Sequence, residues 1–153
     1  MDSLRVGGPQ DAELVGAMLA EFNAEYGESL PTADTIARLA GPQLASGEVA
    51  VLFGPGTPPA GFAQLRFRLS LYDDGPDACL EELWVRPAAR GRGLGRALLL
   101  GAMDLARGRG ATRIDLNTSV SDTAARSLYA SAGFTNEEGP GGPSMLYYER
   151  DLL

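Results

Sequence analysis

The sequence contains no histidine, no lysine and one cysteine, Cys79, among its 153 residues. These absences exclude a Ser-His-Asp triad, a Cys-His pair, a zinc site built from imidazole and thiolate ligands, and a disulfide within the chain. Without lysine the chain can form neither a GK[ST] phosphate-binding loop nor a Schiff base with pyridoxal phosphate. Proton transfer must therefore use carboxylates, tyrosines, the backbone or water, and we expect no bound metal.

The sequence also lacks a long apolar run, because none approaches the roughly 18 residues that a membrane span needs. Its first residues, MDSLRVGG, do not have the basic and then apolar pattern of a secretory signal peptide. We therefore expect a cytoplasmic protein without a membrane partner. Thirteen basic residues, all arginine, against 20 acidic ones give a net charge of −7, which argues against nucleic acid as a partner and is compatible with cationic substrates.

The length of 153 residues is that of one domain, and neither an internal repeat nor a linker divides the chain. We therefore predict a single domain over residues 1–153. A domain of this size typically buries about 68–70% of the surface of its unfolded chain, which is enough for a core and a recessed site.

Hydrophobic periodicity in the first half predicts two helices followed by two strands. From Phe62 to Tyr72 apolar and polar residues alternate, so we expect one face of that strand in the core and the other in water. Thr32 is the expected N-cap of the second helix. The predicted elements are a strand over 3–8, helices over 9–26 and from 32 to about 47, and strands over 49–53 and 62–72.

The second half predicts strands that alternate with helices, with glycines at the helix ends. The expected elements are strand 79–85, helix 96–107, strand 113–118, helix 122–132, a strand beginning at Phe134 and a final strand over 144–152. The order β-α-α-β-β-β-α-β-α-β-β indicates an α/β fold whose first half is mostly antiparallel.

The stretch from Arg90 to Gly95, RGRGLG, lies between a predicted strand and a predicted helix. Its three glycines allow backbone conformations that a side chain would forbid and let a ligand approach the main chain closely. The start of the next helix adds unpaired N–H groups and partial positive charge. Arg90, Arg92 and Arg96 add three positive charges. Together these features predict a site for a phosphate or diphosphate.

Three motifs around this loop resemble those of the GNAT superfamily of acyl-coenzyme A-dependent N-acetyltransferases. The loop matches the family signature Q/R-x-x-G-x-G/A at Arg90, Gly93 and Gly95. The preceding strand matches L-x-V-x-P and a later helix matches L-Y-x-x-x-G-F, at Leu83, Val85, Pro87, Leu128, Tyr129, Gly133 and Phe134. The resemblance implies a mixed, mostly antiparallel sheet with splayed central strands, flanked by about four helices. Since relatives are often dimers, it also allows a homodimer.

The resemblance implies acetyl-coenzyme A as the cofactor. Backbone N–H groups of residues 91–96 would hold its diphosphate, and the strand edge near Leu83 and Val85 would pair with its pantetheine arm. The predicted cofactor-binding residues are Leu83, Trp84, Val85, Arg90, Gly91, Arg92, Gly93, Leu94, Gly95, Arg96, Asn117, Asp122 and Arg126. Asp122 stands where the family more often has asparagine, and it also suits a helix N-cap.

The acceptor nitrogen attacks only when neutral, and a primary amine of pKa near 10.4 costs about 4.6 kcal/mol to deprotonate at pH 7. With no histidine, a carboxylate acting through water is the expected base. Adjacent strand residues point to opposite faces, so only one of Glu81 and Glu82 can face the cleft unless a bulge intervenes. We predict Glu81 as the base, because it alternates with Leu83 and Val85 along the strand and so shares their face. It also stands where some polyamine-acetylating relatives carry their base. Glu82 is the second candidate. Tyr129 would protonate the departing thiolate.

In this fold the first helix pair usually roofs the acceptor site, so the predicted acceptor-binding residues are Phe22, Glu25, Tyr26 and Glu28. Acidic and aromatic side chains suit a cationic small-molecule amine, and a protein amine is the second acceptor class.

An alternative function is a non-catalytic sensor or partner protein of the same fold that binds acyl-coenzyme A; turnover would distinguish the two. A dinucleotide-binding site is excluded by spacing, because its motif would need glycine at Arg96.

Overall fold

The computed structural model describes residues 3–153. It divides the chain into two compact units, the first ending at Leu116 and the second beginning at Asn117. None of the helices in this described part of the chain has the length and apolar character needed to cross a bilayer.

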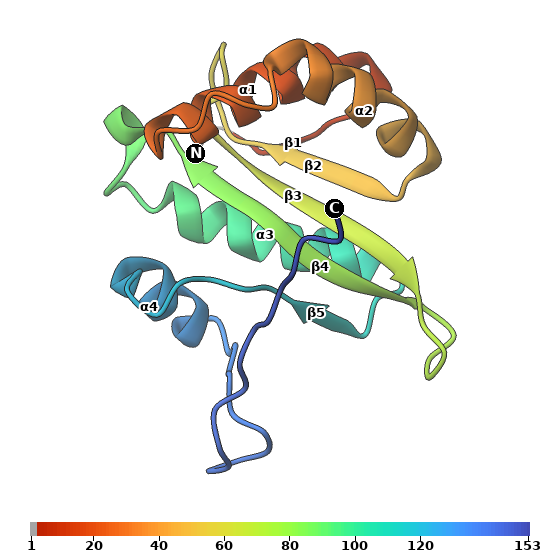
Figure 1. The fold of residues 1–153 in the computed structure, drawn as a ribbon, viewed down its shortest axis with the longest axis vertical. Coiled ribbons are helices and arrows are strands. Elements are labelled where there is room, and N and C mark those ends of the chain that lie inside the picture. The colour runs from red at the N-terminus through yellow and green to blue at the C-terminus, as the bar shows by residue number, and fades with distance from the viewer. Residues whose placement is uncertain (1–2) are drawn as a thin grey trace. The chain divides into compact units, whose positions relative to one another are not determined.

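The first unit is built on a five-stranded sheet in the order β1-β2-β3-β4-β5 (Figure 1). Neighbouring strands from β1 to β4 run antiparallel, and β4 and β5 run parallel. The strands are β1 Arg5–Val6, β2 Val49–Phe53, β3 Gly61–Leu69, β4 Pro76–Val85 and β5 Arg113–Asp115. The helices of this unit are α1 Ala12–Glu25, α2 Ala33–Ser46 and α3 Leu94–Gly108, with short 3₁₀ turns η1 Pro9–Asp11 and η2 Pro87–Ala89.

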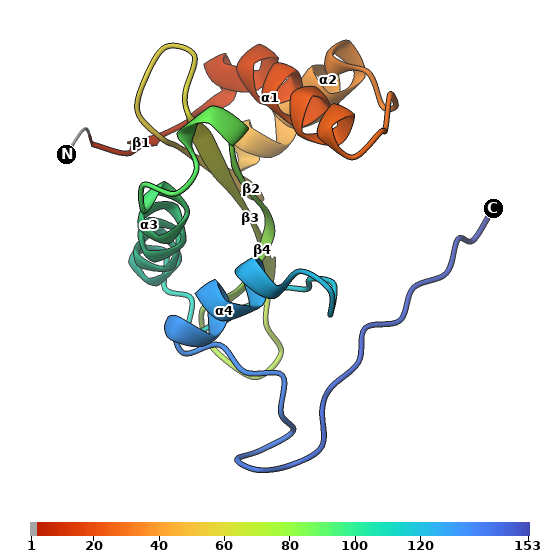
Figure 2. The ribbon, with the colours of Figure 1, turned by 90° about the vertical axis from the view of Figure 1, so that its left-hand side faces the viewer.

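Helices cover both faces of this sheet, as Figure 2 shows, with α3 on one side of the strands and α1 and α2 on the other. The core on the α1 and α2 side includes Val15, Met18, Phe53, Phe62 and Trp84. On the opposite side α3 turns Leu98, Leu99, Ala102 and Ala106 inward, all of them buried. The three helices that the sequence predicted in this part of the chain are thus present, each with an apolar side against the sheet.

Strand β3 differs from the predicted alternation of a core face and a wet face. Phe62, Ala63, Gln64 and Leu65 are all buried, because this end of the strand lies between helices on both sides. At the other end Leu69 is 92% exposed, and the predicted core residue Leu71, beyond the strand, is 99% exposed. A period of two indicates which residues share a face, but the helices decide which part of that face is covered.

Strands β4 and β5 pair over only three residues, Asp77–Cys79 with Arg113–Asp115. Strand β4 continues to Val85, so its later half has no strand partner on that edge within the described part of the chain. The predicted strand over 113–118 is thus shorter than expected, and the predicted splaying of the central strands is confirmed.

The second unit contains α4, Thr123–Ser131, which is capped as the sequence predicted. The Oδ1 atom of Asp122 accepts a hydrogen bond from the backbone N–H of Ala125 at 3.0 Å. Gly133, just after the helix, has a φ of 91°, in the left-handed region where glycine is favoured.

The two predicted strands after Phe134 are absent from the described residues; an isolated bridge pairs Glu137 with Ser144. Residues 145–153 form no regular secondary structure, and Leu146 and Tyr148 are exposed. A segment forms a strand only where a neighbouring backbone supplies hydrogen bonds, and residues 145–153 pair with no strand of the described sheet. The fold class is nevertheless as predicted: residues 3–153 contain a mixed sheet and four helices.

Candidate active site

The glycine-rich loop between η2 and α3 is open and shaped by backbone conformations that favour glycine. Gly91 and Gly93 have φ angles of 76° and 81°. Apart from chain neighbours, no heavy atom of the described residues lies within 4 Å of the place that a Cβ would occupy at either position. Gly93 is the N-cap of α3 and supplies no side-chain cap. The first N–H groups of this helix are therefore left for an anion, and the loop fits a diphosphate.

Arginines surround the same loop, and the structure holds one of them in place. Arg90 Nε donates to the carbonyl oxygen of Val85 at 2.9 Å. Its Nη2 donates to both carboxylate oxygens of Glu25, at 2.6 and 2.9 Å. Arg92 and Arg96 are exposed. The predicted phosphate-binding arginine is thus joined to the last residue of α1.

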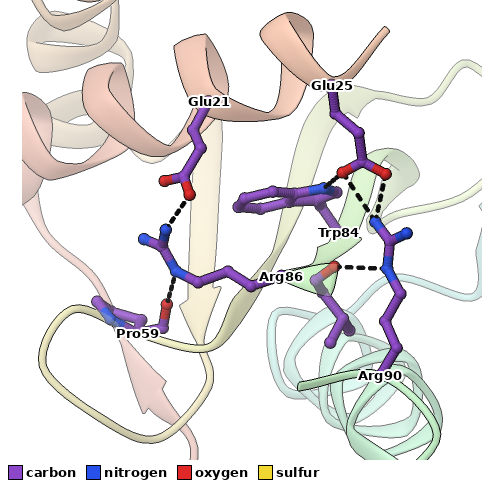
Figure 3. A network of polar contacts seen from close by, with 7 residues as sticks. Glu21, Glu25, Pro59, Trp84, Arg86 and Arg90 are labelled. Atoms are coloured by element: carbon purple, nitrogen blue, oxygen red, sulfur yellow. Dashed lines mark hydrogen bonds and ion pairs between the residues drawn. The ribbon is translucent and has the colours of Figure 1, made fainter. Parts of the chain in front are cut away.

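The carboxylate of Glu25 also binds the buried indole of Trp84 on β4. Trp84 Nε1 donates to Glu25 Oε2 at 2.8 Å (Figure 3). The residue is only 3% exposed. Both the indole bond and the Arg90 guanidinium lower the pKa of Glu25 below its usual range. The Glu25 carboxylate thus accepts hydrogen bonds from Trp84 and Arg90, and its predicted contact with the acceptor stays a prediction.

One helical turn earlier on α1, Glu21 forms a second ion pair, with Arg86 at the end of β4. Arg86 Nη1 donates to Glu21, and Arg86 Nε donates to the carbonyl oxygen of Pro59 at 2.8 Å (Figure 3). The Arg86 guanidinium also lies 5.5 Å from the centre of the Trp84 ring. The carboxyl-terminal half of α1 is therefore fastened to β4 by two arginines.

Strand β4 contains a bulge at Glu81. Gln64 pairs with Glu82 and Leu65 with Leu80, so Glu81 is the extra residue without an opposite number. Directly opposite residues share a face of the sheet, which places Glu82 on the face of Gln64, Phe62 and Trp84.

The bulge overturns the parity argument that favoured Glu81. The Glu81 carboxylate accepts hydrogen bonds from Gln64 Nε2 at 2.9 Å and Arg66 Nε at 2.6 Å, so it lies on the same side as Glu82 and not on that of Leu83 and Val85. Both carboxylates therefore share one face, the outcome that the sequence allowed only if a bulge intervened.

The two carboxylates have different surroundings. Glu81 is ion-paired to Arg66, whose Nη1 also donates to Gln43 of α2 at 2.8 Å. Glu82 is half-buried, and burial together with the nearby charge of Glu81 raises its pKa to about 7. A carboxylate that titrates near neutral pH is suited to accept and release a proton, so Glu82 has the chemistry of a general base.

The remaining predicted cofactor and catalytic residues lie in the second unit. Asn117 precedes α4, and Asp122 acts as its N-cap. Arg126 Nη1 donates to the carbonyl oxygen of Val120 at 3.0 Å. The ring of Tyr129 is half-buried and lies 5.9 Å from that of Phe134. Their roles toward cofactor and thioester stay predictions.

Of the predicted acceptor residues, Phe22 and Tyr26 form an aromatic cluster on α1 with Trp84. The Phe22 ring lies 5.3 Å from the Tyr26 ring and 6.1 Å from the Trp84 ring. Tyr26 is 64% exposed and Glu28 is exposed too, so both are accessible to a ligand. Acceptor binding by these residues stays a prediction.

Sequence reasoning missed the hydrogen-bond partners of Glu81 and Glu25. Gln64 and Arg66 donate to Glu81, Arg66 also donates to Gln43, and Trp84 donates to Glu25. One signal was present: Gln64 and Arg66 alternate on a strand whose antiparallel neighbour carries two glutamates. The contact between Glu25 and Trp84 joins residues 59 positions apart and has no local signal.

Comparison with known proteins gives a consistent result. The model of the acetyltransferase (GNAT) family matches residues 11–134. One solved structure is that of a protein from Arthrobacter sp. FB24 assigned as an acetyltransferase, whose sequence is 43% identical. The two structures match with a TM-score of 0.91 over 99% of this chain and 97% of the other. A structure from Clostridium acetobutylicum, of an assigned acetyltransferase with acetyl-CoA, has a TM-score of 0.78 at 17% identity, covers 99% of this chain and 97% of that one, and shows the shared fold.

Two curated relatives match part of the chain. An aminoglycoside N(6')-acetyltransferase type 1 of Klebsiella aerogenes is 37% identical over 89 residues, which is 57% of this chain and 59% of that protein. A mycothiol acetyltransferase of Beutenbergia cavernae is 38% identical over 80 residues, 42% of this chain and 27% of that protein. The matches thus span about a quarter to three fifths of these relatives.

Proposed function

The chain belongs to the GNAT family of acetyltransferases, and on this basis we propose that it moves an acetyl group from acetyl-coenzyme A to the primary amine of a small, cationic molecule. The observation that carries the proposal is the open glycine loop at the start of α3, next to a strand that bears a glutamate titrating near neutral pH. The relatives named for aminoglycoside and mycothiol acetylation support a small-molecule acceptor.

When bound, acetyl-coenzyme A supplies an acetyl group activated as a thioester. The backbone of Gly91, Gly93 and the first turn of α3 would hold its diphosphate, with Arg92 and Arg96 adding positive charge. The unpaired edge of β4 from Leu80 to Val85 would pair with its amide-containing arm as an added strand does.

Glu82 accepts the proton that the acceptor ammonium must lose before its nitrogen can attack, directly or through one water. Its raised pKa reduces the mismatch with the amine, because a base near pKa 7 holds a proton more strongly than an ordinary carboxylate. The Glu81 carboxylate is ion-paired to Arg66, and its charge is the second cause of the raised pKa of Glu82, after burial. Tyr129 donates a proton to the thiolate that leaves.

Replacing Tyr129 with phenylalanine is expected to lower kcat by about 10-fold, because the departing thiolate loses its proton donor. Steady-state kinetics should show this loss while calorimetry shows unchanged affinity for coenzyme A. Replacing Phe134 with leucine, which disturbs the same aromatic contact without removing a hydroxyl, is the matched control. If kcat falls equally in both variants, the tyrosine has a packing role and no acid role.

The function itself is tested by thiol release from acetyl-coenzyme A with a panel of acceptor amines. Polyamines and aminosugars are expected to react faster than neutral amino acids, since the exposed Tyr26 and Glu28 near the end of α1 suit a cation. Preference for an acidic acceptor would contradict the cationic specificity. Binding of the cofactor without thiol release from any amine would favour the non-catalytic sensor.

A further inference from the structure

The carboxylate of Glu25 joins three parts of the first unit. Glu25 is the last residue of α1, Arg90 opens the glycine loop, and Trp84 lies on β4. Three hydrogen bonds of 2.6 to 2.9 Å converge on its two oxygens (Figure 3). The Glu25 side chain is 25% exposed and that of Arg90 is 46% exposed, so the contact lies at the protein surface but is partly shielded from water.

These contacts fix the Arg90 side chain but do not use all of its hydrogen-bond donors. Its Nε is bound to Val85 and its Nη2 to Glu25, while Nη1 has no hydrogen-bond partner among residues 3–153. A guanidinium carries five N–H donors in a fixed plane, so fixing one edge also fixes the direction of the rest. Arg90 is followed directly by Gly91, the first glycine of the open loop.

We propose that Glu25 is a positioning residue for cofactor binding. Its carboxylate, anchored by Trp84, fixes the Arg90 guanidinium beside the glycine loop. The inference rests on the proposed function and deepens it, because it assigns to Glu25 a role toward the cofactor in place of the acceptor contact that the sequence predicted. A long arginine side chain loses much rotamer freedom when it is ordered on binding. An arginine that is already ordered loses less, and the diphosphate binds more tightly.

The same contact could have the opposite effect, which we call masking: the Glu25 carboxylate would shield the positive charge of Arg90 from a phosphate. A carboxylate next to Arg90 neutralises its charge, and removing that carboxylate would then strengthen the attraction for a phosphate. The two effects have opposite signs. Their balance can therefore be measured with a single substitution.

Trp84 offers a readout that does not depend on activity. It is the only tryptophan in the chain, and its indole N–H is bound to the carboxylate that also binds Arg90. A ligand that engages Arg90 should therefore change the environment of Trp84 through Glu25. We expect coenzyme A to alter the tryptophan emission of the wild type, and to alter it much less in Glu25→Gln and Arg90→Gln.

The experiment is calorimetric titration of coenzyme A into the wild type, Glu25→Gln, Arg90→Gln and the double variant. Each single substitution is expected to raise Kd by about 5-fold to 10-fold, and the double variant should bind no more weakly than Arg90→Gln alone, because the two residues act as one unit. The KM for the acceptor amine should change less than the Kd for coenzyme A. Glu21→Gln is the matched control, since Glu21 lies one turn earlier on α1 and pairs with Arg86 instead.

Unchanged or tighter binding of coenzyme A by Glu25→Gln would overturn the inference, the tighter case by showing that masking prevails. Equal weakening in Glu21→Gln would also overturn it, since the effect would then come from loosening α1 as a whole. Additive losses in the double variant would mean that Glu25 acts without Arg90 and would contradict it too. Failure of the wild type to bind coenzyme A would instead overturn the proposed function.

Discussion

Replacing Gly93 with valine is expected to weaken the binding of coenzyme A by about 100-fold or more, the largest effect of any single change in the loop. Gly93 has a φ of 81°, where a β-branched residue is strained by about 1–3 kcal/mol. Its missing side chain leaves open space at the N-terminus of α3, and a valine would fill that space where an anion approaches the backbone N–H groups. Calorimetry with coenzyme A measures the loss directly.

The matched control for this change is Gly110→Val. Gly110 has nearly the same conformation, a φ of 84°, and also has no heavy atom of a described non-neighbouring residue within 4 Å of a Cβ position, but it follows α3 at the helix's other end. The Gly110→Val substitution should lower the melting temperature about as much as Gly93→Val does, while leaving the affinity for coenzyme A intact. If both variants lose affinity equally, backbone strain and not a filled anion site is the cause.

Replacing Glu82 with glutamine is expected to lower kcat by about 100-fold at pH 8 and to remove the rise of kcat with pH. Burial and the Glu81 charge raise the pKa of Glu82 to about 7, so the group is protonated below that pH and cannot act as a base. The rate of the wild type should therefore rise as pH increases through about 7 and level off once Glu82 is ionised. The measurement is kcat at saturating substrates from pH 5.5 to about 9, a range that spans the base's titration.

Glu81→Gln distinguishes the two carboxylates. Removing the Glu81 charge removes the smaller cause of the raised pKa of Glu82 and leaves burial in place. The inflection should thus move to lower pH without disappearing. The choice made from strand parity predicts the reverse, with the inflection lost in Glu81→Gln and kept in Glu82→Gln, and that result would restore Glu81 as the base.

Most of the fold could be predicted from the sequence where local signals are strong. The strand over Val49–Phe53 and the N-cap Thr32 agree with the structure, because apolar runs and caps depend on neighbouring residues only. The open loop at Gly91 and Gly93 could be predicted as well, since glycines at these positions fit conformations that other residues avoid. The final strand predicted over 144–152 is wrong, because a strand also needs a neighbouring backbone and these residues pair with no strand of the described sheet.

The candidate site was predicted less well, because its polar groups are arranged by long-range contacts. The sequence identified Arg90 and Glu25 as site residues but assigned them to different ligands, and only the tertiary structure brings them into one ion pair. The cofactor contact predicted for Trp84 stays a prediction, and the hydrogen bond from its indole N–H to Glu25 was not predicted from the sequence. Such contacts leave no periodic trace in the sequence.

The extra residue in β4 also affects how roles can be transferred between homologues. An alignment without gaps compares residues by position, whereas the sheet pairs Gln64 with Glu82 and leaves Glu81 unmatched. In a regular strand with the same register from Val85, the residue aligned with Glu81 would lie opposite Leu65, on the face away from Gln64. Catalytic assignments across this strand therefore require counting hydrogen-bonded pairs from Val85, where the register with Gly61 is regular, back toward Leu80.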